Sequence, residues 1–549
     1  MSRKQYNNIR LPKVPRNNFN LSHERRMTAD MFYLYPVLVE DCIPGDIWNL
    51  SNEIVIRMNP MVTPIMHEIN VFVHYYFVPY RLLWKDFEKF ITGGKDGDFV
   101  ADLPTFVPGS YSSTEGYIPT WSPNMANVEG VCDYLGFNPT NNISNWGKNP
   151  SAFPLAAYNF IWHEYYRDQN IIPERSLDVS IEPYDKCPWQ FPRIERNNAI
   201  DKGLEKRAWE KDYFTSMLPW QQRGVSPGIN IAGIGSTIFN FLEVTGTDSS
   251  VNEMTFRISR SDNSNVYSAL QAYSDGVPGA RRFKEVLNDN SIDFTNAIVD
   301  TDVSDLRLSF QIQKFLERNA RTGVRYVEFL KAHFPAYPRD DRLDRPEYIG
   351  GSKTPVIISE VLQTSQSVDG APQGTMSGHG LSADRTRVAK YRVQEFGLIM
   401  GIMSIMPRTL YQDGIDRVWL KESKYDFYFP EFANLSEQAV FTEELYNYKP
   451  LPIDRVMGYQ GRYDEYRYKR NSVHGLFRTD FDMWHMGRKF GSAPTLNSDL
   501  LYPNAAESLA LKRVLAVDTE PMFLVAVGNK NSAIRPLPYI AEPGLVDHG

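Results

Sequence analysis

The stretch INVFVHYYFV, residues Ile69–Val78, is apolar at nearly every position. A strand that is apolar on both sides is usually covered on both sides, as in the centre of a β-sandwich. The nearby stretch NEIVIRM, residues Asn52–Met58, alternates instead, with Ile54 and Ile56 on one side and Val55 on the other. Together the two stretches predict a sheet with one face packed on a core.

Further strands are predicted on either side of this region. LYPVLVEDC begins at Leu34, FGLIMGIMSIM spans Phe396–Met406, and MFLVAVGN spans Met522–Asn529. The last strand is far from the first strands in sequence, so the pairing must be non-local, as in a Greek key. The chain has 35 Gly and 36 Pro, which indicate frequent turns. Aromatic residues make up 13% of it, and aromatic residues favour β-strands. These features predict a mainly β sandwich or barrel.

Helical periodicity is limited to three segments, Arg81–Gly94, Leu155–Asn170 and Asp305–Phe334. They do not alternate regularly with the strands, so we interpret them as parts of long connections.

His74, within an aromatic strand, is expected to be a packed, hydrogen-bonded core residue.

Composition limits the class of protein. The chain has 549 residues, of which 42% are hydrophobic and 23% charged, as in soluble globular proteins. Its longest apolar runs are shorter than the roughly 20 residues of a membrane span, and MSRKQYNNIR lacks the apolar stretch of a secretory signal. We therefore expect no membrane insertion.

Motifs for metal, cofactor or catalysis are missing from the sequence. The three cysteines, Cys42, Cys132 and Cys187, have no zinc-ligand spacing and are expected to be buried thiols. GIGSTI, residues Gly233–Ile238, lacks the third glycine of a dinucleotide-binding loop. We expect no catalytic residue, no cofactor and no metal, and interpret adjacent acidic pairs such as Asp340-Asp341 as solvated surface.

Residues 1–26 hold seven basic side chains against one acid, Glu24. We interpret them as an extended basic arm rather than a helix or strand. It is either a solvated tail or an arm that binds phosphate or a neighbouring subunit. Its basic residues are Arg3, Lys4, Arg10, Lys13, Arg16, Arg25 and Arg26.

The segment GYQGRYDEYRYKRNSVHGLFR, residues Gly458–Arg478, interleaves tyrosines with cations. Aromatic rings can stack on unpaired bases while cations contact phosphate, which suits single-stranded nucleic acid. Tyrosine and arginine are also typical of subunit interfaces, so the segment predicts an interface, a nucleic-acid site or both. The candidates are Arg462, Tyr463, Tyr466, Arg467, Tyr468, Lys469 and Arg470.

Residues Gly224–Asp300 are rich in Ser, Asn, Asp and Gly, and they are too long for a routine loop. We interpret them as an inserted surface subdomain, with a small hairpin at Met254–Ser259. Ser365–Ser382 has the composition of a flexible loop.

Seven segments spread over nearly the whole chain carry a specific resemblance. They are PGDIWN (Pro44–Asn49), RMNPMVTPIMHEINVFVHYYFVPYRLLWKDFEKFITGG (Arg57–Gly94), LPWQQRG (Leu218–Gly224), FQIQKFLERNARTGVRYVEFLKAHF (Phe310–Phe334), DRLDRPEYIGGS (Asp341–Ser352), DGIDRVWLKESKYDFYFPEFANLSEQAV (Asp413–Val440) and Gly458–Arg478. In these segments the chain resembles the major capsid proteins of the Microviridae, in particular the gokushovirus branch. Gln221 stands where the pattern has proline, and the insertion and the segment around Cys42 match loosely.

The resemblance implies an eight-stranded antiparallel jelly roll with long helix-containing insertions. Its parts would be a basic arm (1–26), a first jelly-roll part (27–223), an inserted subdomain forming a threefold protrusion (224–300) and the jelly-roll remainder (301–549). Host-contact candidates in the insertion are Asn230, Asn240, Asp248, Asn252, Asn263 and Asn265.

The resemblance also implies sixty copies in a T=1 icosahedral shell around circular single-stranded DNA, assembled in the cytoplasm of a bacterial host. Implied partners are an internal scaffolding protein, a DNA pilot protein, a small basic DNA-binding protein and a host receptor. The net charge of −7 argues against coating of nucleic acid over the whole surface, so positive side chains must be concentrated toward the lumen. A polysaccharide-active enzyme and a free-standing single-stranded DNA-binding protein are the alternatives.

Overall fold

The computed structural model describes residues 15–92, 99–105, 127–139, 148, 150–172, 203–224, 257–259, 265–267, 270–273, 282–285, 303–321, 344–362, 376–450, 452 and 455–540. Contacts divide the chain into two units, residues 1–221 with 323–549, and residues 222–322. The second unit overlaps the expected insertion 224–300 and also includes helix α5 (Val303–Arg321), whereas the sequence predicts that these residues belong to the jelly-roll remainder, 301–549. It further holds the short strands β6 (Arg257–Ser259), β7 (Asn265–Tyr267), β8 (Leu270–Tyr273) and β9 (Arg282–Glu285).

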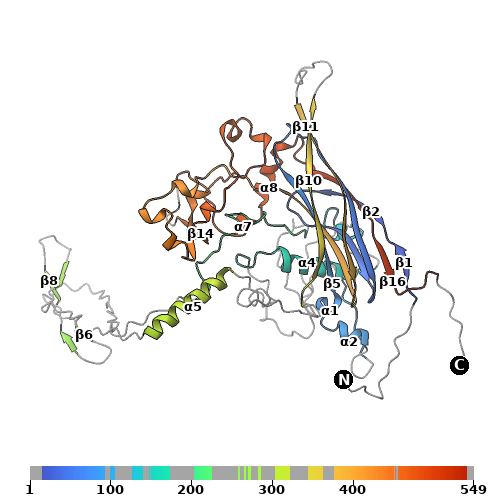
Figure 1. Ribbon diagram of the computed structural model, residues 1–549, viewed down its shortest axis with the longest axis horizontal. Helices are drawn as coiled ribbons and strands as arrows, with labels where there is room; N and C mark the ends of the chain where they lie inside the picture. Colours follow the sequence, from blue (N-terminus) through green and yellow to red (C-terminus); the bar gives the residue numbers. More distant parts are fainter. Residues whose placement is uncertain are drawn as a thin grey trace. The chain divides into compact units, whose positions relative to one another are not determined.

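The first unit is built on one antiparallel sheet of ten strands (Figure 1). The path runs β1-β16-β4-β11-β10-β5-β12-β3, and β15 pairs with both β4 and β2. The sheet curls because β10 changes partner: residues 347–356 pair with β5, and residues 357–362 pair with β11. The predicted mainly β, antiparallel jelly roll with insertions is confirmed. The strands are β1 (Asn17–Asn20), β2 (His23–Ala29), β3 (Tyr35–Cys42), β4 (Ile47–Met58), β5 (Ile69–Pro79), β10 (Glu347–Leu362), β11 (Met376–Arg392), β12 (Gly397–Pro407), β15 (Phe523–Asn529) and β16 (Ser532–Arg535).

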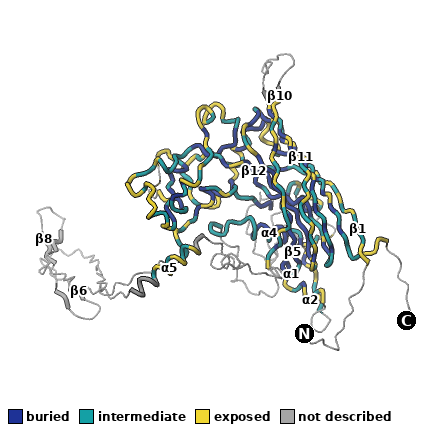
Figure 2. The backbone as a smooth tube through the Cα atoms, viewed as in Figure 1, coloured by how far each residue is buried: buried dark blue, intermediate teal, exposed yellow. Residues whose placement is uncertain are grey.

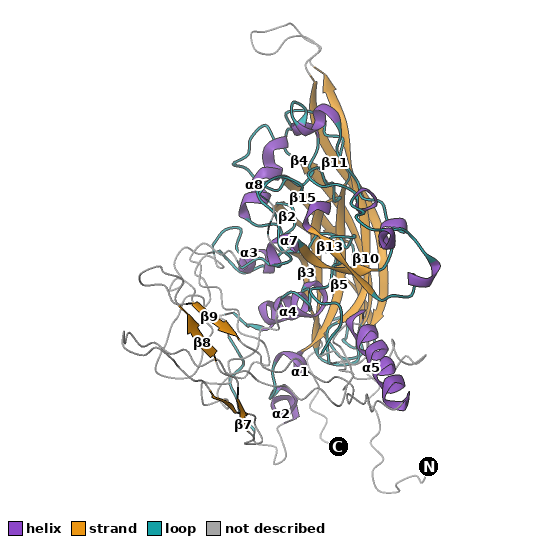
Figure 3. Cartoon of the chain, turned by 90° about the vertical axis from the view of Figure 1, so that its left-hand side faces the viewer, coloured by secondary structure: helices purple, strands orange, loops and turns teal. Residues whose placement is uncertain are grey.

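Strands β5 and β12 are buried on both faces (Figure 2). One face packs on the core inside the curl, and helices cover the other (Figure 3). In this cover, the Tyr158 hydroxyl donates to the Leu34 carbonyl and accepts from the Glu205 amide, both at 2.8 Å. The helices of the first unit are α1 (Tyr80–Leu83), α2 (Phe87–Thr92), α3 (Val131–Leu135), α4 (Phe153–Ile161), the π-helix η3 (Trp162–Tyr166), α7 (Ser498–Leu501) and α8 (Ala505–Leu511).

Strand β4 has one buried and one open face. Trp48, Leu50 and Ile56 are buried, whereas Val55 is 36% exposed. Alternating burial along β4 follows the predicted alternation of apolar residues. The half of the sheet formed by β2, β15, β4 and β11 therefore has one side turned away from the core.

A second, smaller core supports the segments after β12. It joins residues far apart in sequence, Tyr213, Phe214, Met217, Tyr411, Val440, Leu445, Met457 and Leu500. The elements around it are short: η6 (Arg417–Trp419), η7 (Lys424–Asp426), η8 (Pro430–Phe432), β13 (Glu437–Phe441), η9 (Thr442–Glu444), β14 (Val456–Gly461), η10 (Asp464–Tyr466), η11 (Gly475–Arg478), η12 (Asp482–Trp484) and η13 (Lys512–Val514).

Four local predictions need correction. The second half of the basic arm forms strands β1 and β2, because β16 and β15 supply backbone partners. The predicted helix over Arg81–Gly94 is two short helices, and the helix over Leu155–Asn170 becomes a π-helix at Trp162. Residues 376–382 of the expected loop belong to β11, which pairs with β10. Residues 323–334, the end of the third predicted helix, lie outside the described residues.

Candidate interaction surfaces

The side chain of Arg470 is used inside the chain. Its two Nη atoms donate to the backbone carbonyls of Glu444 and Gly414, both at 2.6 Å. Its Nε lies 2.7 Å from a carboxylate oxygen of Asp416, and the side chain is 14% exposed. Arg470 therefore connects its own loop to the segments at residues 414–416 and at Glu444. Each of its guanidinium nitrogens already has a partner within the chain.

The tyrosine at the centre of the predicted site is also internal. Tyr463 is buried, and its hydroxyl donates to the Phe427 carbonyl at 2.9 Å. Arg462 donates to the Tyr425 carbonyl at 2.8 Å and lies 4.6 Å from the centre of the Tyr463 ring. These contacts hold residues 425–427 in place.

A buried carboxylate anchors the same region. Glu444 accepts from the Tyr213 hydroxyl at 3.0 Å and from Arg417 Nη1 at 2.8 Å. Burial raises the pKa of the Glu444 carboxyl, and the Arg417 guanidinium opposes that shift. Tyr468 stacks on Tyr213, with ring centres 6.0 Å apart. Four of the seven candidate residues thus contact other loops of their own unit: Arg462, Tyr463, Tyr468 and Arg470.

The remaining candidate residues differ in their exposure to solvent and in whether they lie among the described residues. Tyr466, Arg467 and Lys469 are exposed, although Arg467 pairs with Asp464. Among the described residues of the arm, Arg16 and Arg26 are exposed and Arg25 is half-buried. Asn265 begins β7. The calls that lie outside the described residues are Arg3, Lys4, Arg10, Lys13, Asn230, Asn240, Asp248, Asn252 and Asn263.

A cluster of exposed rings, which we call the aromatic surface, lies over residues 417–435 and Tyr466. Tyr428 and Tyr466 pack edge to face, with ring centres 6.1 Å apart. Lys421 connects the cluster, because its Nζ donates to the Tyr466 hydroxyl at 2.8 Å and lies 4.4 Å from the centre of the Phe427 ring. Its exposed members are Trp419 (79%), Tyr425 (55%), Phe427 (55%), Tyr428 (52%), Phe429 (42%), Leu435 (54%) and Tyr466 (51%).

The aromatic surface is electrically balanced. Residues 417–435 carry three basic and three acidic side chains. A clustered apolar patch with both signs of charge is typical of protein–protein interfaces, where aromatic residues are enriched. It is poorly suited to a polyanion.

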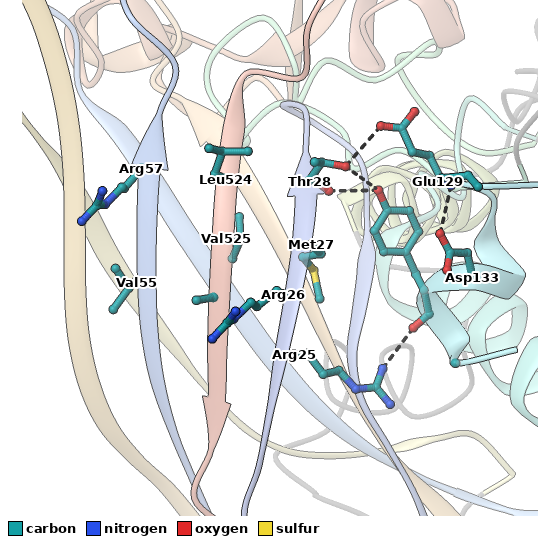
Figure 4. A pocket seen from close by; sticks show the side chains of 14 residues that line it. Arg25, Arg26, Met27, Thr28, Val55, Arg57, Glu129, Asp133, Leu524 and Val525 are labelled. Carbon is teal, nitrogen blue, oxygen red and sulfur yellow. Dashed lines mark hydrogen bonds between the residues drawn. The ribbon is translucent and has the colours of Figure 1, made fainter. Parts of the chain in front are cut away.

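A groove of about 770 Å³ follows the β2 edge of the sheet (Figure 4). Its floor includes Val55, Arg57 and Leu524, and its wall comes from residues 128–136 around α3. The wall is fixed by hydrogen bonds from Thr28 Oγ1 to Glu129 Oε1 (3.1 Å) and from Arg25 Nη1 to the Tyr134 carbonyl (3.0 Å). Burial lowers the pKa of the Arg25 guanidinium, while Glu40 opposes the shift.

The groove opens onto the outward side of β2, β15, β4 and β11. Strand register places Arg26, Ala526 and Val55 in one row, and Leu524 and Arg57 in the next. We call this side the basic sheet face. Its charged residues are Arg26, Arg57, Arg385, Arg387, Lys390, Arg392 and Lys530, with Glu24 and Glu53.

The sequence analysis missed both surfaces as units. The available signal for the basic face was the period-two spacing of cations in DRTRVAKYR, residues Asp384–Arg392, which matches an exposed strand side. The signal for the aromatic surface was the density of rings in the run VWLKESKYDFYFPEF, within which Tyr425, Phe427 and Phe429 alternate as in a strand although no strand forms there.

The described residues contain no group of three or more His, Cys, Asp or Glu side chains arranged to hold a metal ion. Nor does any helix among them have the length and apolar character to cross a membrane. A jelly roll whose conspicuous external features are an aromatic surface and a basic face fits the class of structural proteins that associate with other macromolecules.

Comparison with known proteins assigns the family. The model of the family described as "Capsid protein (F protein)" matches residues 7–545, and the chain belongs to this family. The chain is 32% identical to capsid protein VP1 of Chlamydia phage 1 over 98% of its own length and 97% of the relative. It is 29% identical to capsid protein VP1 of Bdellovibrio phage phiMH2K, covering 96% of this chain and 94% of that one. Identity to capsid protein VP1 of Spiroplasma virus 4 is 26%, over 97% and 96%.

The predicted membership of the Microviridae capsid proteins is thereby confirmed. The chain is a structural protein of a virion and not an enzyme, so the polysaccharide-active alternative is set aside.

Proposed function

We propose that sixty copies of this chain form a T=1 icosahedral shell around circular single-stranded DNA. The observation that carries this proposal is the aromatic surface, an exposed and charge-balanced cluster of rings on a chain of the capsid family. An interface core of this kind is completed by a second copy, and symmetry repeats each contact around the shell. Many moderate contacts then give a stable particle without any single tight one.

The rest of the assembly follows from the family resemblance. We propose an internal scaffolding protein, a DNA pilot protein and a small basic DNA-binding protein as partners during assembly in the bacterial cytoplasm. The insertion at residues 224–300 is the proposed threefold protrusion that contacts a host receptor. Its polar composition suits a surface segment that tolerates change.

The experiment that tests the proposal uses Trp419, which is 79% exposed on the aromatic surface. Tryptophan is enriched among interface hot spots, whose truncation costs about 2 kcal/mol or more, which is roughly a 30-fold weakening of each contact. Trp419→Ala should therefore abolish or strongly reduce closed particles seen by electron microscopy, when the chain is expressed with its viral partners.

Trp419→Phe is the matched control, because it keeps a large aromatic ring, and it should restore particles. Nuclease-protected circular single-stranded DNA should accompany the particles of the unsubstituted chain and of the control. Closed particles with normal yield from Trp419→Ala would remove the aromatic surface from the interface. Particles without protected single-stranded DNA would refute the proposed cargo.

A further inference from the structure

The basic sheet face concentrates positive charge on an acidic chain. Seven cations and two carboxylates leave an excess of five positive charges on this face, and Arg25, Glu129 and Asp133 in the adjoining groove reduce the excess to four, while the whole chain carries −7. The aromatic surface, by contrast, has no net charge. The two surfaces are therefore suited to different partners: a protein for the aromatic surface and a polyanion for the basic sheet face.

Strand register fixes the spacing of the cations. Arg385 lies opposite Glu53, Arg387 opposite Ser51, and Lys390 opposite Asn49. A bulge after Arg387 shifts the register by one residue and keeps Lys390 on the same side as Arg387. Because alternate residues of a strand face one side, successive cations stand about 7 Å apart. That step is comparable with the separation of phosphates along an extended single strand.

The side chains of these cations form no ion pair with other described residues. No ion pair within 4.0 Å joins any of them to a described carboxylate, in contrast to Arg470 or Arg488. All seven are exposed; six lie on strands β2, β4 and β11, and Lys530 lies in the connection between β15 and β16. A row of unpaired cations on a fixed backbone can neutralise phosphates at little ordering cost.

The face lacks the rings that would bind bases. The outward positions of residues 23–29, 47–58, 381–392 and 523–529, all described, hold no Phe, Tyr or Trp. Small apolar residues such as Val55, Ala526 and Ala383 lie between the cations instead. This chemistry suits the sugar–phosphate backbone and makes contact independent of base sequence.

From these observations we infer that the basic sheet face binds the phosphates of the packaged single-stranded DNA, with the groove beside β2 as part of the path. The inference rests on the proposed shell around single-stranded DNA. It assigns the DNA contacts to β2, β4 and β11 rather than to the Arg462–Arg470 segment. The binding is electrostatic and non-specific.

The test compares two triple variants of the full chain. The first, Arg387→Gln, Lys390→Gln and Lys530→Gln, removes three charges from the basic sheet face. The control replaces Lys85, Lys148 and Lys449 by Gln and removes three exposed charges that lie outside both the basic sheet face and the aromatic surface. Particles of each variant are purified, and their single-stranded DNA content per capsid chain is measured.

Affinity for a single-stranded oligonucleotide is measured on the purified chain at several salt concentrations. Each phosphate contact adds about 0.7 to the salt slope of single-strand binding. Losing three contacts should lower the slope by about 2, which is roughly a 100-fold loss of affinity at 0.1 M salt if the contacts contribute nothing at 1 M. The control should keep the slope and the DNA content of the unsubstituted chain.

Each outcome decides the inference. Normal DNA content and an unchanged salt slope in the first variant would overturn it and would favour an acidic protein as the occupant. An equal loss in both variants would also overturn it, because the effect would then follow net charge alone. If the first variant forms no particles, the salt dependence of its affinity for the oligonucleotide alone tests the inference. Failure of the unsubstituted chain to form particles would instead refute the proposed function.

Discussion

Arg470 and Lys469 are adjacent in sequence, yet the structure gives them opposite roles. Arg470 donates two hydrogen bonds at 2.6 Å to backbone carbonyls, and Lys469 is exposed. A hydrogen bond from a charged group contributes about 1.5–3 kcal/mol, so losing two costs about 3–6 kcal/mol. Asp416, also paired with Arg470, is 38% exposed and adds little, because water can replace its partner.

We therefore expect Arg470→Gln to lower the free energy of unfolding by about 3–6 kcal/mol. Lys469→Gln, the matched control, should change it by less than about 0.5 kcal/mol. Urea unfolding of the purified chain, followed by tryptophan fluorescence, measures both values. The packaged DNA of assembled particles should be unchanged by Lys469→Gln.

One result would refute the internal role of Arg470. If Arg470→Gln kept the stability of the unsubstituted chain but reduced packaged DNA, the guanidinium would serve the cargo and not the fold. That result would favour the nucleic-acid alternative for the Gly458–Arg478 segment.

Three further predictions concern the jelly roll itself. Burial lowers the pKa of His74 to about 4, and the ring is hydrogen-bonded to Tyr166, so the folded chain keeps it neutral. Because the unfolded chain protonates this histidine below about pH 6.5, stability should fall as the pH drops from 6.5 toward 4. His74→Gln should reduce the total loss of stability over this interval by up to about 3 kcal/mol, measured by urea unfolding at each pH. Gly397→Ala should cost about 1–3 kcal/mol, because the added methyl would lie 2.5 Å from a carbonyl oxygen of the neighbouring strand, whereas Gly491→Ala, with open space around it, should be neutral in the same assay. Tyr158→Phe should cost about 2–6 kcal/mol, since its hydroxyl bonds two buried backbone groups that would both lose a partner; an unchanged melting temperature would contradict this.

The sequence predicted the strands that carry a local signal. β5 and β12 are runs of apolar residues, and β4 alternates, so each is recognisable without knowledge of its neighbours. Their burial on both faces, or on one, follows directly from that pattern. The predicted hydrogen bonding of His74 is confirmed by its contact with Tyr166, but the side chain is only partly buried, unlike its neighbours along β5.

Strand β11 could not be recognised, because its inward side is polar. Ser382 donates to the Pro355 carbonyl, and Asp384 accepts from Thr354 and Thr386 at 2.7 and 2.6 Å. These hydrogen bonds hold the pKa of the Asp384 carboxyl below its usual range. A strand with hydrogen-bonded polar residues inside and cations outside lacks the apolar alternation that predicts strands.

Strand β2 was missed for a different reason. HERRMTA has the composition of a solvated arm, and its partner β15 lies near the other end of the chain. Similarly, a segment rich in tyrosine and arginine, such as Gly458–Arg478, has the same composition whether its side chains bind a ligand or a neighbouring loop. The hydrogen bonds from Arg470 to two backbone carbonyls show the contact with neighbouring loops, which composition could not predict.

The most direct test is the mass of the assembled particle. Sixty chains of 63.1 kDa have a mass of about 3.8 MDa before any cargo is added. Native mass measurement on particles from cells that express the chain with its viral partners should give this value plus that of the enclosed single-stranded DNA. Discrete monomers or small oligomers under the same conditions, with no closed species, would contradict the conclusion that the chain is one unit of a symmetric shell.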